Sequence, residues 1–105
     1  MGSNHIKFNK LVRDKIPAYI KSSGGVPVTH IAKKKEYWQK LKEKLHEEIK
    51  EFLESEGFEE LADVQEVIDA ILSYKKFNRK KLEVIRKKKV KERGAFKKKI
   101  ILEES

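Results

Sequence analysis

Hydrophobic residues recur at helical spacing through the middle of the chain. Between residues 33 and 55 the large apolar side chains fall three or four positions apart, which is typical of one face of an α-helix. They are Trp38, Leu41, Leu45, Ile49 and Phe52. The pattern predicts a helix of roughly 20 residues that ends near Ser55.

A second and broader apolar run follows Gly57. One stripe is widened by further small and branched residues: Leu61, Val64, Ile68, Ile71 and Leu72 in the stripe, with Ala62, Val67 and Ala70 beside it. So wide an apolar surface predicts a helix that is buried on most sides. Because only a turn around Ser55, Glu56 and Gly57 separates the two runs, together they predict a helical hairpin.

Shorter signals predict the elements on either side of the hairpin. Asp14 is placed to cap a helix whose first turn contains Pro17 and which stops at Gly24. Asn78 is placed to cap a third long helix that continues to Arg93 and ends at Gly94. Alternating or β-branched residues at 5–12, 26–32 and 100–102 predict three short strands, and the last is expected to pair with one of the first two.

These elements predict a mainly α fold, with a helical hairpin at its core, a third long helix and short β-strands near the ends of the chain. The 105 residues, 38% hydrophobic and 41% charged, have room for one small domain, which we expect to span 1–105. So modest a core would gain from a homodimer or homotetramer. No apolar run approaches the roughly 20 residues that span a bilayer, and no signal peptide is visible, so we expect a cytoplasmic protein without membrane contact.

Charge and cysteine content narrow the chemistry. Lys and Arg total 26 against 17 Asp and Glu, a formal net charge of +9, which favours a polyanionic partner such as nucleic acid or the phosphates of a small molecule. The chain contains no cysteine, which excludes disulfides, thiolate zinc sites and thiol nucleophiles. Its three histidines have no zinc-binding spacing, and we expect all of them on the surface.

Carboxylates at two helical spacings are the strongest candidates for chemistry. Glu48 and Glu51 lie three apart in the first half of the hairpin, and Glu60 and Asp63 lie three apart in the second. Four carboxylates brought together across a hairpin repel one another unless a cation lies among them. Mg²⁺ suits such a site because it prefers oxygen ligands and is often shared with substrate phosphates, and Mn²⁺ is an alternative.

The other acidic residues of the hairpin have a simpler interpretation. Acidic residues of a helix usually face solvent, and we assign four to that role: Glu47, Glu54, Glu56 and Glu59. Glu66 and Asp69 lie on the second helix but are rotated away from Asp63. They are interpreted as supporting ligands, ion-pair partners or interface residues.

Basic residues at the ends of elements are candidate phosphate ligands. Lys10, Arg13 and Lys15 lie at a predicted strand-to-helix junction, where backbone N–H groups and cationic side chains converge. Lys91 and Arg93 precede Gly94 at a similar junction. By contrast, most of the lysines in the triplets at 33–35, 87–89 and 97–99 are expected to be solvated.

The acidic motifs also carry a family resemblance. The segment 44–51, KLHEEIKE, followed by Glu60-Leu61-Ala62-Asp63, resembles the paired ExxE and ExxD motifs of the all-α nucleoside triphosphate pyrophosphohydrolase (MazG) superfamily. The segments 9–17, NKLVRDKIP, and 92–96, ERGAF, resemble its phosphoribosyl-ATP pyrophosphohydrolase-like subgroup. Only eight residues separate Glu51 from Glu60, fewer than is usual in the superfamily, so a tight turn is expected.

The resemblance implies an enzyme. It implies Mg²⁺-dependent hydrolysis of the α–β phosphoanhydride of a nucleotide to a monophosphate and pyrophosphate, acting on non-canonical nucleoside triphosphates or on phosphoribosyl-ATP. The implied metal ligands and catalytic residues are Glu48, Glu51, Glu60 and Asp63, and the implied substrate-binding cations are Lys10, Arg13, Lys44 and Arg93. Two alternatives stay open: a basic helical protein that binds nucleic acid, and a regulatory domain that binds a nucleotide without turnover.

Overall fold

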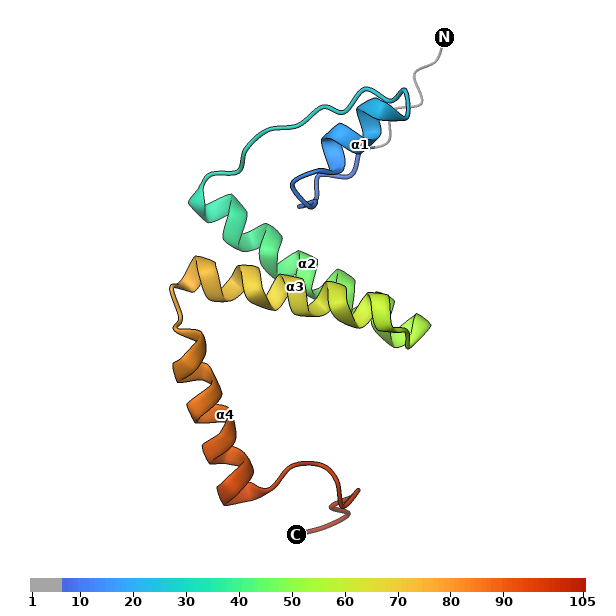
Figure 1. Cartoon of the computed structure of the whole chain (residues 1–105). Coiled ribbons are helices and arrows are strands. Elements are labelled where there is room, and N and C mark those ends of the chain that lie inside the picture. Colours follow the sequence, from blue (N-terminus) through green and yellow to red (C-terminus); the bar gives the residue numbers. More distant parts are fainter. Residues whose placement is uncertain (1–6) are drawn as a thin grey trace. The chain divides into compact units, whose positions relative to one another are not determined.

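A computed structural model describes residues 7–105, and in this range the chain is helical without any strand (Figure 1). The four helices are α1 (Ile16–Ser22), α2 (Lys34–Ser55), α3 (Phe58–Lys75) and α4 (Arg79–Arg93). The prediction of a mainly α fold is confirmed, as are the helices predicted on both sides of Gly57 and the third long helix.

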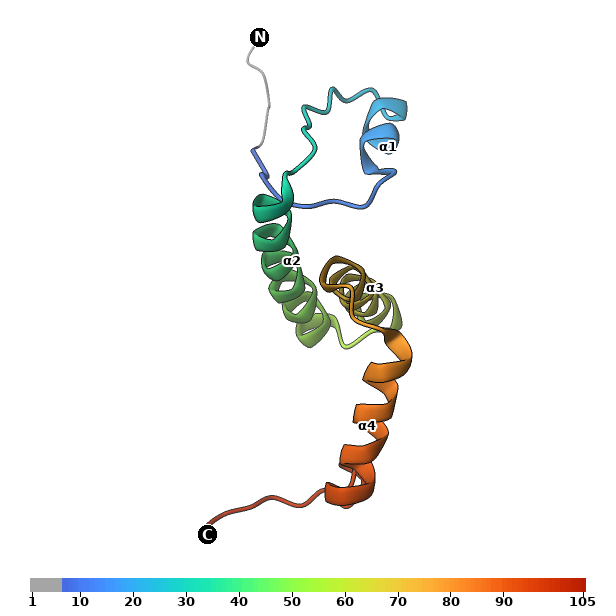
Figure 2. The same ribbon diagram turned by 90° about the vertical axis from the view of Figure 1, so that its left-hand side faces the viewer.

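α2 and α3 form the predicted hairpin, and α3 runs back beside α2 in both views (Figures 1 and 2). The connection is as tight as the sequence predicts, because only Glu56 and Gly57 lie between the two helices. The residue with left-handed backbone is Glu56 (φ 57°, ψ 27°), and its N–H donates to the Phe52 carbonyl. A non-glycine residue in this conformation is strained, and glycine is the usual choice at the end of a helix.

The core of the described chain is small. Leu41 of α2 is completely buried, and Val67 and Leu72 of α3 are nearly so. The prediction that α3 is buried on most sides is wrong, since Leu61 and Ile68 are about half exposed at 50% and 41%. The physical reason is that the apolar residues of α3 surround much of its axis, whereas one neighbouring helix covers a single stripe.

The predicted strands at 26–32 and 100–102 are also wrong. The first of these segments connects α1 to α2, the second lies in the tail after α4, and neither is assigned to a strand. A strand needs a partner for its backbone groups, and alternating side chains cannot supply one. Residues 7–12 are not a strand either, while His5 and Ile6 of that prediction lie outside the described residues.

The ends of the helices agree with most of the predicted signals. Pro17 lies in the first turn of α1, but Lys15 rather than Asp14 is the N-cap residue. The side chain of Asn78 accepts a hydrogen bond from the Lys81 N–H and caps α4, and Gly94 (φ 86°) ends it.

Contacts divide the chain into two compact units, Met1–Ile71 and Leu72–Ser105. The first unit contains α1, α2 and most of α3, and the second contains α4 and the tail. Among the described residues, no helix combines the length and the apolar character that crossing a membrane requires.

Candidate metal centre

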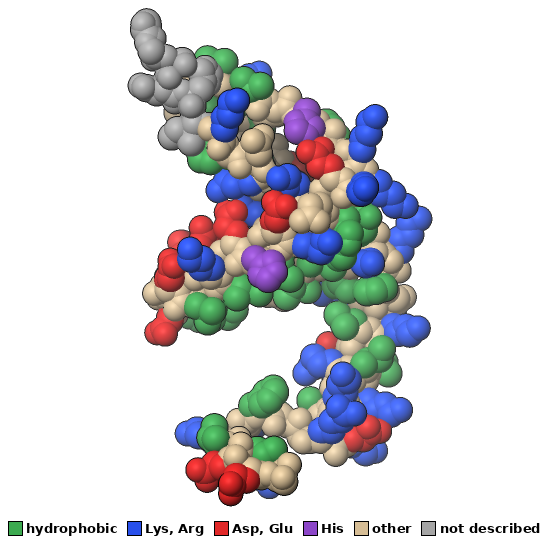
Figure 3. All heavy atoms as spheres, turned by 180° about the vertical axis from the view of Figure 1, so that it is seen from behind, with side chains coloured by type: hydrophobic (Ala, Val, Ile, Leu, Met, Phe, Trp, Pro, Cys, Tyr) green, Lys and Arg blue, Asp and Glu red, His purple; other side chains and the backbone are tan. Residues whose placement is uncertain are grey.

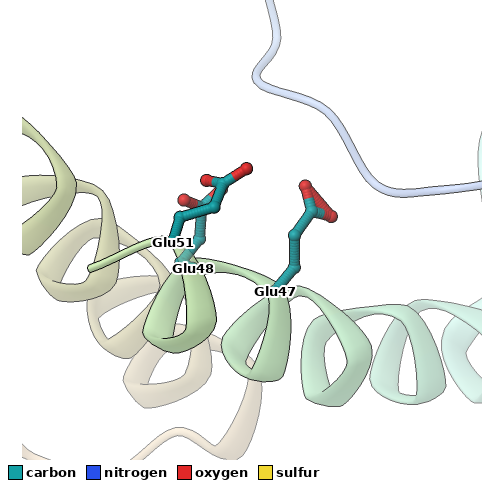
Figure 4. A group of neighbouring side chains, drawn as sticks. All are labelled: Glu47, Glu48 and Glu51. Carbon is teal, nitrogen blue, oxygen red and sulfur yellow. The ribbon is translucent and has the colours of Figure 1, made fainter. Parts of the chain in front are cut away.

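Three glutamates of α2 bring their carboxylates together. Glu47, Glu48 and Glu51 each place one oxygen so that all three oxygens lie within 4.8 Å of one another. Their spacing of one, three and four residues puts them on one side of the helix, and Figure 4 shows them pointing away from it in the same general direction. Two of the three, Glu48 and Glu51, belong to the set predicted from the sequence.

Glu48 is the buried member of the cluster. It is 6% exposed, and its Oε1 lies 3.1 Å from the Lys44 Nζ, one turn earlier on α2. Its Oε2 is buried and has no hydrogen-bond partner among the described residues. Leaving a buried acceptor unpaired costs about 1–3 kcal/mol, and more when the acceptor is charged. The described chain therefore supplies neither a hydrogen-bond donor nor a cation to the Glu48 Oε2.

The pKa of Glu51 is affected by the neighbouring carboxylates of the cluster. The hydrogen bond that a protonated Glu51 can donate to Glu48, together with the negative charge of Glu48, raises the pKa of Glu51 above its ordinary value of 4.5. Two neighbouring carboxylates favour a shared proton because both cannot accept without a donor between them. A bound cation would remove the need for that proton.

Glu47 lies in the cluster although the sequence assigned it to the solvent face, so that assignment is wrong. Its Oε1 lies 3.1 Å from the Lys10 Nζ and 3.2 Å from the Lys44 Nζ. Partial burial raises the pKa of Glu47, but the hydrogen bonds from the two lysines outweigh it and lower the pKa overall. The signal that could have found Glu47 was its four-residue spacing from Glu51.

α3 contributes two of the predicted carboxylates to an adjoining hollow. This open hollow of about 460 Å³ is lined by Glu51, Glu54, Ser55, Glu60 and Asp63. The Ser55 hydroxyl donates to Glu60 over 2.8 Å across the hairpin turn. Glu51 belongs both to the hollow and to the cluster on α2, so it links the four carboxylates predicted from the sequence.

Two of the predicted phosphate-binding cations reach these carboxylates from the segment before α1. The Arg13 guanidinium donates to Asp63 over 2.7 Å, and Lys10 pairs with Glu47. Lys44 lies between Glu47 and Glu48, where partial burial lowers its pKa but the hydrogen bonds to Glu48 and Glu47 outweigh this and raise the pKa overall. Arg93 ends α4 in the second unit and is exposed, so its role at the carboxylates stays a prediction.

The remaining candidates lie at the surface or only partly below it. Glu54, Glu56, Glu59 and Glu66 are exposed, and Asp69 is half-buried. His30 is exposed and pairs with Glu36 at 2.9 Å, and His46 is exposed, whereas His5 lies outside the described residues. For residues 7–105, the group with metal-binding geometry is thus made of carboxylates and contains no histidine.

The donor set fits a hard divalent cation. The cluster and the hollow together contain six carboxylates: Glu47, Glu48, Glu51, Glu54, Glu60 and Asp63. Three cations pair with members of this set: Lys10, Arg13 and Lys44. The excess is negative, all the donors are oxygen, and one buried oxygen is unpaired. Mg²⁺ and Mn²⁺ prefer such ligands.

Comparison with protein-family models, with curated proteins and with solved structures finds no match to this chain.

Proposed function

We propose that the chain is a Mg²⁺-dependent nucleotide pyrophosphohydrolase that cleaves the α–β phosphoanhydride of a nucleoside triphosphate or a related nucleotide. The observation that carries this proposal is the buried carboxylate of Glu48, whose Oε2 has no partner and whose neighbour Glu51 has a raised pKa. Perturbed carboxylates beside a hollow are typical of functional sites.

The residues that would hold the cation are Glu48 and Glu51, with Glu47 beside them and Glu60 and Asp63 across the hollow. When bound, a divalent cation neutralises phosphate charge and lowers the pKa of a water molecule. The hairpin contributes by presenting these carboxylates from two helices joined by a two-residue turn, so that few conformational changes are needed to assemble the site.

The cations of the first unit have a role in binding substrate. Lys10 and Arg13 already lie against Glu47 and Asp63, so they are within reach of a polyphosphate that enters the hollow. A guanidinium exchanges a carboxylate for a phosphate at little geometric cost, because both ligands accept two parallel hydrogen bonds. Lys44 is held within the cluster and orients Glu47 and Glu48, and Arg93 is proposed as a further phosphate ligand.

The reaction consumes one water molecule. Its oxygen bonds to the α-phosphorus, the bond from that phosphorus to the bridging oxygen breaks, and pyrophosphate leaves. One carboxylate of the site that is not fully used in holding the cation accepts the proton of the water. The fold we propose is that of the all-α pyrophosphohydrolases, and the exposed apolar side chains of α3 support a homodimer or homotetramer.

The test is an assay of the purified chain with a panel of canonical and non-canonical nucleoside triphosphates and phosphoribosyl-ATP, with and without Mg²⁺. We expect pyrophosphate release that requires Mg²⁺ and falls about 10–100-fold or more in Glu48→Gln and in Asp63→Asn, because a metal ligand or its support is lost. In ¹⁸O-labelled water the label should enter the monophosphate, because water attacks the α-phosphorus.

Glu43→Gln is the matched control. Glu43 lies on the same helix, but it accepts hydrogen bonds from Gln39 and Lys40 rather than facing another carboxylate. This variant should keep full activity. Nucleotide binding without pyrophosphate release in any condition would refute the enzyme and favour a regulatory domain.

A further inference from the structure

The net positive charge of the chain is confined to its second unit. Unit Leu72–Ser105 contains 14 Lys and Arg residues against 4 Asp and Glu, a net charge of +10. Unit Met1–Ile71 contains 12 against 13, a net charge of −1. The proposed metal centre lies in the nearly neutral unit, so the excess of cations, Arg93 apart, is not explained by that centre.

α4 is where most of this charge lies. Its 15 residues include nine cations and two acids, Glu83 and Glu92, which pair with Arg86 and Lys88. The cations are Arg79, Lys80, Lys81, Arg86, Lys87, Lys88, Lys89, Lys91 and Arg93. Figure 3 shows Lys and Arg side chains gathered over this helix. α4 buries none of its residues, so their charges are accessible.

The cations lie on every side of the helix axis. At about 100° per residue, Arg79, Arg86 and Arg93 follow one line, because they are seven residues apart. Lys80, Lys87 and Lys91 follow a second line, and Lys81 and Lys88 lie on the opposite side from the arginines. A partner that meets all of these charges must present anions on more than one side of the helix.

The distribution of charged and apolar residues around α4 favours a nucleic acid duplex over a membrane surface as the polyanionic partner. A helix that lies on a membrane needs one continuous apolar face, whereas on α4 Val84 lies nearly opposite Leu82. The side that carries Leu82, Ile85 and Val90 is interrupted by Arg86 and Lys89. The groove of a nucleic acid duplex is different, because phosphates line both of its walls. A helix about 10–12 Å across fits a B-form major groove about 12 Å wide, and 15 residues extend about 22 Å along it.

We propose that α4 binds double-stranded nucleic acid in its groove through the phosphate backbone, independently of the pyrophosphohydrolase site. Binding of this kind depends little on sequence and is dominated by the release of counterions. An isolated helix of 15 residues with like charges is marginal in water, so neutralising its cations should also increase its helicity.

The experiment titrates the full chain into a fluorescently labelled 20-base-pair DNA duplex and follows anisotropy at several salt concentrations. With about five phosphate contacts, the affinity should fall about 500-fold between 50 and 200 mM salt. Circular dichroism should show a gain of helix on binding. Vesicles with anionic lipid headgroups provide the comparison for a membrane surface.

Two lysine triplets give a matched pair of variants. Replacing Lys87, Lys88 and Lys89 by Gln removes three charges from α4, and replacing Lys33, Lys34 and Lys35 by Gln removes three from the first unit. The side chains at 87–89 leave the helix in three directions, so one or two reach phosphates, and losing each contact costs about 8-fold at 0.1 M salt. We expect weakening of about 8–60-fold for the first variant and less than about 2-fold for the second.

Lys and Gln have similar helix propensities, so the Gln substitutions should leave the helix intact. A third variant, Lys→Arg at 87–89, keeps the charge and should bind the duplex like the parent chain. Equal weakening by both Gln triplets would overturn the proposal, since it would mean that net charge alone drives binding. Absence of duplex binding at 50 mM salt, or tighter binding to the vesicles than to the duplex, would overturn it as well. Pyrophosphate release is measured separately and should be unaffected by the substitutions at 33–35 and 87–89.

Discussion

Replacing Glu48 by Gln should make the metal-free chain more stable and abolish its response to Mg²⁺. Glu48 is buried, its Oε1 accepts from Lys44, and its Oε2 lacks a donor beside the carboxyl of Glu51. The amide of Gln keeps an oxygen for Lys44 and offers an N–H to Glu51. A repulsive pair thereby becomes a hydrogen bond.

The magnitude follows from three contributions. Removing a like-charge pair at helical spacing gains about 0.2–0.5 kcal/mol. Satisfying the buried polar group at Oε2 gains about 1–3 kcal/mol, and weakening the bond from Lys44 to a neutral oxygen offsets about 1 kcal/mol. The expected net gain is about 0.2–2.5 kcal/mol, and each 1 kcal/mol raises the melting temperature by about 4–8 °C. For the parent chain, Mg²⁺ at ten times its Kd should add about 1.4 kcal/mol, and for the variant almost nothing.

The assay is thermal unfolding followed by circular dichroism, with and without Mg²⁺, for the parent chain, Glu48→Gln and Glu43→Gln. Glu43 accepts from Gln39 and Lys40, and these bonds lower its pKa, so its replacement should slightly destabilise the chain and leave the Mg²⁺ response intact. If Glu48→Gln destabilises the chain and its Mg²⁺ response matches that of the parent, Glu48 is a structural partner of Lys44 and not a metal ligand.

Three further changes test other parts of the account. Leu41→Ala should destabilise the chain by about 2–5 kcal/mol in denaturant unfolding, since Leu41 is fully buried in a small core; a loss below about 1 kcal/mol would contradict that core. Glu56→Gly should stabilise it by about 1 kcal/mol in the same assay, because Glu56 has left-handed backbone, and destabilisation would show that the side chain matters more. The raised pKa of Glu51 means that the metal-free fold gains stability as the pH falls through that pKa, whereas Mg²⁺ competes with the proton. The increase in melting temperature caused by Mg²⁺ should therefore grow from about pH 4.5 upwards and level off above the raised pKa, and a pH-independent increase would argue against Glu51 as a ligand.

The helices were predictable because their signals are local. The three-and-four spacing from Trp38 to Phe52, the cap at Asn78 and the stop at Gly94 each act within a few residues along the chain. The strands were not predictable in the same way, because alternation in 26–32 indicates a preference for extended backbone but not the presence of a partner strand. The prediction that α3 is buried on most sides was wrong for a related reason, because an apolar surface does not reveal how many neighbouring elements cover it.

The candidate site was predictable in part. The sequence pointed to Glu48, Glu51, Glu60 and Asp63, and the structure connects them through the position of Glu51. The sequence assigned Glu47 to the solvent face because surface acidic residues are common. In the structure, however, Lys10, 37 residues away in sequence, pairs with Glu47. Contacts over such a separation depend on the path of the segment before α1, and no local pattern specifies that path.

The most direct test of the central claim is the binding of Mn²⁺ to the chain, followed by the electron paramagnetic resonance signal of the free ion. We expect the parent chain to bind Mn²⁺, excess Mg²⁺ to displace it, Glu48→Gln to lose the binding and Glu43→Gln to retain it. Equal Mn²⁺ binding by the parent chain and Glu48→Gln, or no binding by either, would contradict the proposed metal centre at Glu47, Glu48 and Glu51.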